Sequence, residues 1–121
     1  DALYELGFMY ENGEGIEEDD EKAVHHFEKA AIAGHPYARN RLGWIEEGNG
    51  NIERAVKHFI IAANLGYEIS MKALWGHYSC GNITKKDLEA TLRTHKAAID
   101  ATKSSQRDAA EAIYRRNTAS R

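Results

Sequence analysis

The sequence predicts an all-α protein in which antiparallel helix hairpins stack into an α/α superhelix, or solenoid. Composition is the first reason: of 121 residues, 18 are Ala, whereas only 2 are Val and 1 is Pro. Ala is the strongest helix former, Val favours strands, and Pro interrupts helices. The second reason is an internal repeat, each copy of which has the length of a helix hairpin. A chain of this length forms one domain with a modest core.

The repeat consists of small, aromatic and glycine positions that return in the same order. The two copies are offset by 36 residues at their start and by 32 near their end, so the second copy has the shorter internal loop. A weaker third copy follows. The first copy contains Leu6-Gly7, Ala23, Phe27, Ala30-Ala31 and Gly34, and the second contains Leu42-Gly43, Ala55, Phe59, Ala62-Ala63 and Gly66.

The first copy predicts a hairpin with one helix over residues 2–12 and a second helix from Asp19 to Ala33. Asp19 is a favourable N-cap, and acidic side chains follow it in the first turn, where the helix dipole favours negative charge. Gly34 supplies the left-handed conformation that ends many helices. Pro36 then stands at a favourable first-turn position, so we expect the next helix to begin there.

The second copy predicts a helix that Asn51 caps and that ends at Leu65, where Gly66 stops it. Glycines also predict a turn between the two helices of each hairpin, at 13–15 in the first copy and at 48–50 in the second. These glycines do not form a phosphate-binding loop, because no strand precedes them and no Lys-Ser/Thr pair follows.

The third copy begins less distinctly. Thr84 and Asp87 have the spacing of a capping box, which predicts a helix to about Lys103. A separate C-terminal capping helix is expected over 104–117, followed by a frayed tail at 118–121. The predicted repeat units are therefore 2–36, 38–68 and 70–103.

Small residues recur where the helices of a hairpin are expected to cross. They are Gly7 and Gly43 on the first helices, and Ala23 and Ala55 on the second helices. Glycine destabilises a helix interior by about 1 kcal/mol relative to Ala, so two glycines at equivalent positions indicate a geometric need. We expect close helix contacts there.

The complete pattern, from Ala2 to Ala38, resembles the Sel-one-like repeat, a relative of the tetratricopeptide repeat. About a dozen positions agree in order and spacing, and the resemblance extends over residues 1–101. Glu46 stands where the second unit usually has Tyr, and Trp75 replaces the glycine of the third. The resemblance implies a right-handed superhelix and an adaptor that assembles protein complexes. It implies no shared catalytic residue.

The first helix of each unit in related superhelices lines a concave surface that takes a peptide. Glu11 and Glu47 stand where some tetratricopeptide domains bind a C-terminal carboxylate with basic residues, and only Lys72 is basic. A groove with acidic edges favours a basic or apolar peptide. Phe8 and Trp44 have the alternative of packing between units. The candidate partner-binding residues are Tyr4, Phe8, Glu11, Asn12, Tyr37, Asn40, Trp44, Glu47 and Lys72.

Charge is unevenly distributed along the chain. The net charge is −3, but residues 1–53 carry −9 and residues 54–121 carry +6. Solvated helix faces explain this simply; the alternative is a polarised molecule with an acidic and a basic docking end. No dense basic run predicts nucleic-acid binding, and no long apolar run predicts membrane insertion. Without a signal peptide, a cytoplasmic location is expected.

No motif predicts a catalytic, cofactor or metal site. His25 and His26 are adjacent and therefore point in different directions on a helix, and no His-Glu-x-x-His is present. His26 and His58 occupy equivalent, semi-exposed helix positions. Cys80 follows the C-terminal, negative end of a helix, which opposes thiolate formation, so it is expected to be buried or merely tolerated. We expect no metal, no cofactor and no small-molecule substrate.

The sequence thus predicts a non-catalytic scaffold or adaptor domain that binds a protein or peptide partner on its concave face. We expect a monomeric domain within a longer chain. Two alternatives remain open at this point. One is a regulatory repeat segment of a larger enzyme, for example a ubiquitin ligase with a zinc module. The other is a purely architectural solenoid segment.

Overall fold

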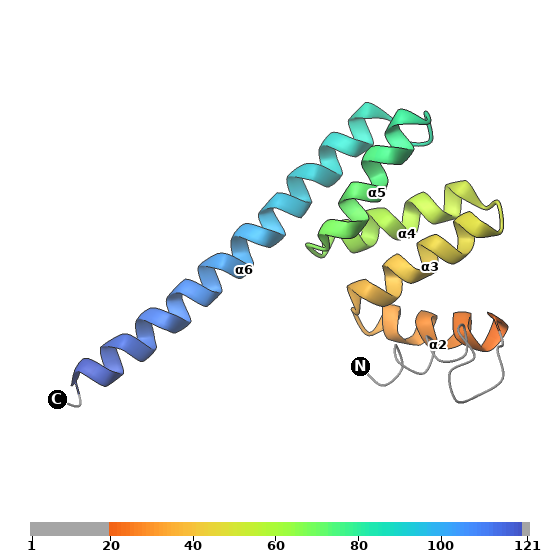
Figure 1. The fold of residues 1–121 in the computed structure, drawn as a ribbon. Coiled ribbons are helices and arrows are strands. Elements are labelled where there is room, and N and C mark those ends of the chain that lie inside the picture. The colour runs from red at the N-terminus through yellow and green to blue at the C-terminus, as the bar shows by residue number, and fades with distance from the viewer. Residues whose placement is uncertain (1–19, 120–121) are drawn as a thin grey trace.

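The computed structural model describes residues 20–119, and this part of the chain is an array of helices without strands. Neighbouring helices pack against one another in chain order, and α4 also packs against α6 (Figure 1). The predicted all-α helical repeat is therefore confirmed. The helices are α2 (Asp20–Ile32), α3 (Pro36–Gly48), α4 (Ile52–Asn64), α5 (Glu68–Ser79) and α6 (Lys85–Ala119).

Some predictions concern residues outside this range. The expected helix over 2–12, the glycine turn at 13–15 and Gly7 lie outside the described residues. So do the candidate binding residues Tyr4, Phe8, Glu11 and Asn12.

The predicted helix ends at Gly34 and Gly66 are confirmed. Both glycines have a left-handed backbone, with φ of 92° and 94° respectively. Their N–H groups and those of the residues after them bond to the last turn of the preceding helix, which satisfies carbonyls that would otherwise lack partners. Pro36 is the first residue of α3, as expected.

Asn51 precedes α4 as predicted, but the prediction that its side chain caps this helix is wrong. Its Nδ2 donates instead to Oε2 of Glu46, at 2.8 Å, across the turn from α3. A hydrogen bond to a carboxylate is stronger than one between neutral groups, so the side chain is drawn to Glu46 rather than to the helix N–H groups. The capping by Thr84 is confirmed, because its Oγ1 accepts from the N–H of Asp87 at 3.1 Å.

Two apolar clusters form the core of the described residues. One joins α2 to α3 around Phe27, and the other joins α4, α5 and the start of α6 around Phe59 and Leu74. All three of these large side chains are fully buried. Burial of a side chain of this size stabilises the fold by about 1.5–3 kcal/mol.

The expected close crossing at Gly43 is confirmed. A Cβ atom added there would lie 2.6 Å from Cε1 of Phe59, so only glycine lets α3 approach the ring this closely. Ala23 and Ala55, the small residues expected at crossings on α2 and α4, have no exposed surface.

Helix α6 differs from the expectation of two helices divided near residue 104. It continues without a break for 35 residues, roughly 50 Å at 1.5 Å per residue. No Gly or Pro lies between its ends, and Ala is frequent, so the serines at 104 and 105 do not end it.

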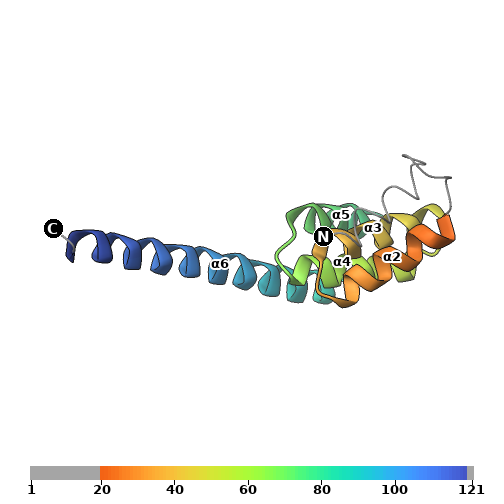
Figure 2. The same cartoon turned by 90° about the horizontal axis from the view of Figure 1, so that it is seen from below.

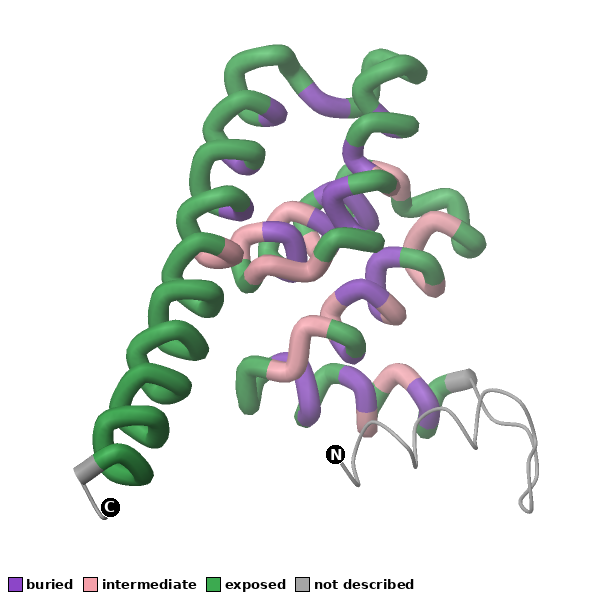
Figure 3. Tube along the Cα trace, turned by 60° about the vertical axis from the view of Figure 1, so that its left-hand side comes forward, coloured by how far each residue is buried: buried purple, intermediate pink, exposed green. Residues whose placement is uncertain are grey.

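The two halves of α6 have different surroundings. Leu88, Thr91 and His95 are buried against α4 and α5, and Nδ1 of His95 donates to the carbonyl oxygen of Ala63 at 2.8 Å. Every residue over 100–118 is exposed, and this half extends past the other helices (Figures 2 and 3). The expected capping helix over 104–117 therefore caps no surface of the described residues.

Candidate functional site

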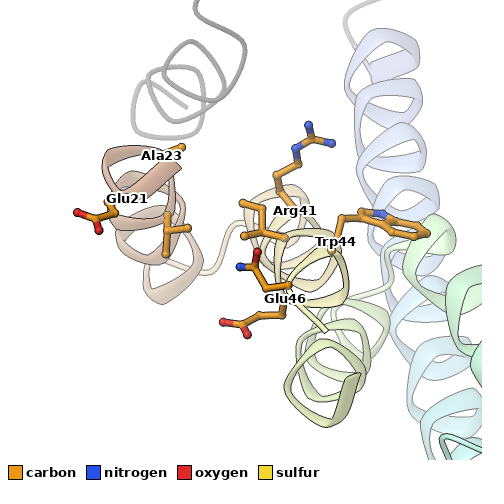
Figure 4. A pocket seen from close by; sticks show the side chains of 9 residues that line it. Glu21, Ala23, Arg41, Trp44 and Glu46 are labelled. Atoms are coloured by element: carbon orange, nitrogen blue, oxygen red, sulfur yellow. The ribbon is translucent and has the colours of Figure 1, made fainter. Parts of the chain in front are cut away.

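Two cavities lie on either side of α3, and Trp44 lines both. The larger, about 610 Å³, lies between α2 and α3. Its charged side chains do not converge: Glu21 points away from α3, and the guanidinium of Arg41 points along a different direction (Figure 4). The smaller, about 350 Å³, lies between α3 and α5 and contains the more organised set of polar groups.

We call the smaller cavity the α3–α5 cleft. Its walls are the ends of α3 and α5, which are the first helices of successive hairpins, and the turns that follow these helices. The lining residues are Trp44, Glu47, Ile52, Ala73, Gly76, His77, Cys80 and Asn82.

A chain of hydrogen bonds joins the two walls of the cleft. Nε2 of His77 lies 3.2 Å from Oε1 of Glu47, and Nδ1 of His77 lies 3.0 Å from Nδ2 of Asn82. An amide nitrogen can only donate, so Nδ1 of His77 accepts from Asn82 and Nε2 donates to Glu47. This arrangement fixes the position of the Glu47 carboxylate at the edge of the cleft.

Phe59 of α4 packs against residues of both walls of the cleft. Its buried ring contacts the Trp44 ring edge to face, with centroids 5.2 Å apart, and lies 5.6 Å from the His77 ring at a 32° tilt. Aromatic pairs of this kind contribute about 0.5–1.5 kcal/mol beyond area burial. The same side chain that occupies the crossing at Gly43 therefore positions the aromatic and polar groups of the cleft.

The predicted binding residues of α3 and α5 have different positions in the structure. Trp44 (43% exposed) and Glu47 line the cleft, whereas Tyr37 is exposed at the other end of α3 and contacts the Tyr67 ring edge to face. Lys72 is exposed on α5 and lies 4.0 Å from Glu68.

Asn40 does not lie on an open surface as expected. It is only 7% exposed, and its Oδ1 accepts from the Ser70 hydroxyl at 2.7 Å. This bond joins α3 to α5 inside the array. The polar pairing explains why an asparagine occupies a buried helix position.

Sequence reasoning did not assign His77, Gly76 or Asn82 to the site. One signal was present: Gly-Asn-Ile follows both helices that line the cleft, at 50–52 and 81–83. In both turns the asparagine Nδ2 contacts the side chain five residues earlier, Glu46 in one and His77 in the other. The pairing of His77 with Glu47 joins different hairpins, so no spacing within one unit reveals it.

A second polar group lies outside the cleft, on α3 and α4. His58 is half-buried, and its Nδ1 lies 3.5 Å from a guanidinium nitrogen of Arg39. Burial lowers the pKa of His58 below its ordinary value of 6.5, and the nearby Arg39 and Arg54 cations lower it further, while Glu46 and Glu28 oppose this. The net effect favours the neutral form of His58 relative to an exposed histidine.

Cys80 is exposed at the end of α5, at the edge of the cleft. Within residues 20–119, no three His, Cys, Asp or Glu side chains come close enough to share a metal ion. No helix in this part of the chain is both long and apolar enough to cross a membrane.

The Sel1 repeat family matches residues 1–35 and 36–67, which together are more than half of the chain. The chain belongs to the Sel1 repeat family. Sel1 repeats generally mediate protein–protein interactions and are generally not catalytic. No curated protein matches the chain. The match ends at residue 67, so α5 and α6 follow the two matched Sel1 repeats.

Proposed function

We propose that this Sel1 repeat protein is a scaffold or adaptor domain that binds a peptide or helix of its partner at the α3–α5 cleft. The observation that supports this is Trp44. Its ring is substantially exposed, yet its contact with buried Phe59 holds it in place. A pre-positioned Trp provides a large contact area with little loss of conformational freedom on binding.

The binding surface extends from the cleft along α3. Tyr37 precedes Trp44 by seven residues, so two helical turns place both rings on the same side of the helix. Both rings are exposed. An extended or helical peptide reaches both positions, whereas a small molecule in the cleft does not. The proposal assigns the domain no catalytic residue.

We also propose that residues 70–103 are a third, divergent repeat unit. In its favour, α5 and α6 form a helix hairpin as α3 and α4 do (Figure 1). The turns after α3 and α5 have the same backbone hydrogen bonds as well: Asn51 N–H bonds to the Glu46 carbonyl, and Asn82 N–H to the His77 carbonyl.

A matched pair of tryptophan variants tests the binding proposal. Trp44 and Trp75 are 43% and 47% exposed, but only Trp44 lines the cleft. The 121-residue chain is incubated with a positional-scanning library of acetylated octapeptides, and bound peptides are sequenced. We expect wild type and Trp75→Ala to retain the same peptides. Trp44→Ala should retain at least tenfold less of these peptides, while its circular dichroism spectrum shows that it remains folded.

Three results would overturn the proposal. If wild type retains no peptide above background, an architectural solenoid segment explains the fold better. If Trp44→Ala retains the same peptides as wild type, the binding surface lies away from the cleft. If Trp75→Ala reduces peptide retention as much as Trp44→Ala does, the interface is not confined to the α3–α5 cleft and includes the surface of α5 around Trp75.

A further inference from the structure

We infer that the α3–α5 cleft receives a basic side chain, Arg or Lys, of the bound peptide, placed between the Trp44 ring and the Glu47 carboxylate. This inference rests on the proposed peptide binding and names the side chain that the cleft selects.

The charge of the cleft supports a cationic occupant. Glu47 contributes the one carboxylate among the lining residues that the structure describes. Its side chain is 31% exposed, and only Oε1 is engaged, by His77. Within residues 20–119, Oε2 of Glu47 has no hydrogen-bond donor or cation beside it. It is therefore available to a ligand.

His77 orients the carboxylate of Glu47. The Asn82 amide lies 3.0 Å from Nδ1 of His77, and Nε2 on the other side of the ring faces Oε1 of Glu47 at 3.2 Å. His77 engages Oε1 alone, so Oε2 of Glu47 still faces the cleft side of this contact as an acceptor for a ligand. A partly desolvated carboxylate of this kind gains most from a ligand cation.

Gly76 provides the space for this side chain. It lies in the last turn of α5, and a Cβ added to it would meet nothing within 4 Å apart from its two neighbours in the chain and the nearby backbone of its own helix. Its φ is not positive, so neither backbone conformation nor packing requires glycine there. Glycine nevertheless lowers helix stability relative to Ala. Gly76 lines the cleft, and its missing side chain leaves open the space at this position.

The remaining walls suit a long basic side chain. Ile52 and Ala73 offer apolar contact to its methylene groups, which Lys and Arg commonly bury while the charged end stays hydrated. The Trp44 ring lines the cleft and is 43% exposed, and aromatic rings attract guanidinium and ammonium groups through their π-electrons. Aromatic and carboxylate groups thus act on the same cation.

The test uses the peptides selected by the wild-type chain. The best-retained octapeptide is synthesised with its selected basic residue and again with citrulline, which has the shape of Arg without the charge. Affinities are measured by fluorescence polarisation for wild type, Glu47→Gln and Glu53→Gln. Glu53 is an exposed carboxylate of α4 outside the cleft. Each of the two variants removes one negative charge, but only Glu47→Gln removes it from the cleft.

We expect Arg or Lys to be enriched at one library position. Citrulline and Glu47→Gln should each weaken binding at least fivefold, their effects should not add, and Glu53→Gln should change affinity less than twofold.

Enriched peptides without a basic residue would overturn this inference and leave the proposed function intact. An equal loss in both Glu variants would also overturn it, because general electrostatic attraction would then explain the preference. No retained peptide at all would be a failure of the proposed function itself.

Filling the space at Gly76 provides an independent readout. Gly76→Gln should weaken binding of the basic peptide at least fivefold while leaving the unfolding midpoint unchanged or higher. Unchanged affinity in a folded Gly76→Gln variant would show that the ligand does not enter this space, and would overturn the inference.

Discussion

Gly43 and Gly76 lie on the two helices that line the cleft, α3 and α5, but their surroundings are opposite. A side chain at Gly43 would collide with the Phe59 ring, whereas a side chain at Gly76 would enter open space. Packing explains the first glycine fully and the second not at all. The contrast teaches that a helical glycine becomes a candidate for function when neither its backbone nor its neighbours require it.

The two positions are nevertheless connected. Phe59 fills the crossing at Gly43, and the same ring supports Trp44 and His77 in the cleft. The stability of the array and the geometry of the cleft therefore depend on one side chain. The following substitutions separate these two contributions.

The largest effect is expected for Phe59→Ala. The ring has no exposed surface, and removal of a buried Phe destabilises a protein by about 3–5 kcal/mol. Urea unfolding followed by circular dichroism measures the change. Ile61→Ala is the control, because Ile61 lies on the same helix but is 41% exposed. This variant should lose far less free energy of unfolding than Phe59→Ala. A loss below about 1 kcal/mol for Phe59→Ala, within the range of ordinary substitutions, would show that this ring does not hold the array together.

Gly43→Val should destabilise the fold by about 1–3 kcal/mol, because the added methyl groups overpack the crossing between α3 and α4. The same substitution at Gly76 is the control and should be close to neutral. Equal effects at the two sites would remove the contrast between them.

A double substitution sharpens this result. Phe59→Leu shortens the side chain that faces Gly43, so Gly43→Ala should destabilise the Phe59→Leu background less than the wild type. A coupling of about 0.5 kcal/mol or more between the two changes is expected for residues in contact. Additive effects would contradict a direct contact between Gly43 and Phe59.

Gly76→Ala should stabilise the fold by about 0.5–1 kcal/mol, since Ala is the better helix former and meets no neighbour there. The unfolding midpoint in urea should rise accordingly. A lower midpoint would mean that Gly76 has a packing role after all, and the open space would lose its functional interpretation.

The smallest effect concerns pH. Burial and the cations of Arg39 and Arg54 lower the pKa of His58 below 6.5 in the folded protein, so the unfolded chain takes up this proton more readily. The stabilising contribution of neutral His58 is therefore complete above about pH 6.5 and is lost as the pH falls through the folded pKa. Stability measured from pH 7.5 to pH 5 should fall less in His58→Gln than in wild type. Identical pH profiles would argue against this role of His58.

Local sequence determined much of the fold. Gly34, Pro36, Gly66 and Thr84 mark helix ends that the structure confirms, because caps and left-handed glycines act over a few neighbouring residues. The close approach at Gly43 followed from its place in the repeat. The continuity of α6 was missed, because a serine that could cap a helix does not end one when Ala-rich sequence continues on both sides.

The candidate site was only half visible in the sequence. Trp44 and Glu47 were found from their place on the first helix of a repeat, and they do line the cleft. Asn40, chosen by the same reasoning, is buried because Ser70 of the next hairpin offers it a hydrogen bond. A repeat pattern states which residues are equivalent, but not which partner the neighbouring unit places opposite them.

The sequence by itself therefore determined most helix ends in residues 20–119 and the order of these helices in a Sel1 repeat array. Only the tertiary structure decided that His77 faces Glu47, that Phe59 supports both walls of the cleft, and that the space at Gly76 is open. The physical reason is the distance along the sequence between the residues that interact. Helix capping and periodicity depend on residues a few positions apart. The cleft depends on contacts between side chains about 15 to 30 residues apart, which only the packing of helices against one another brings together.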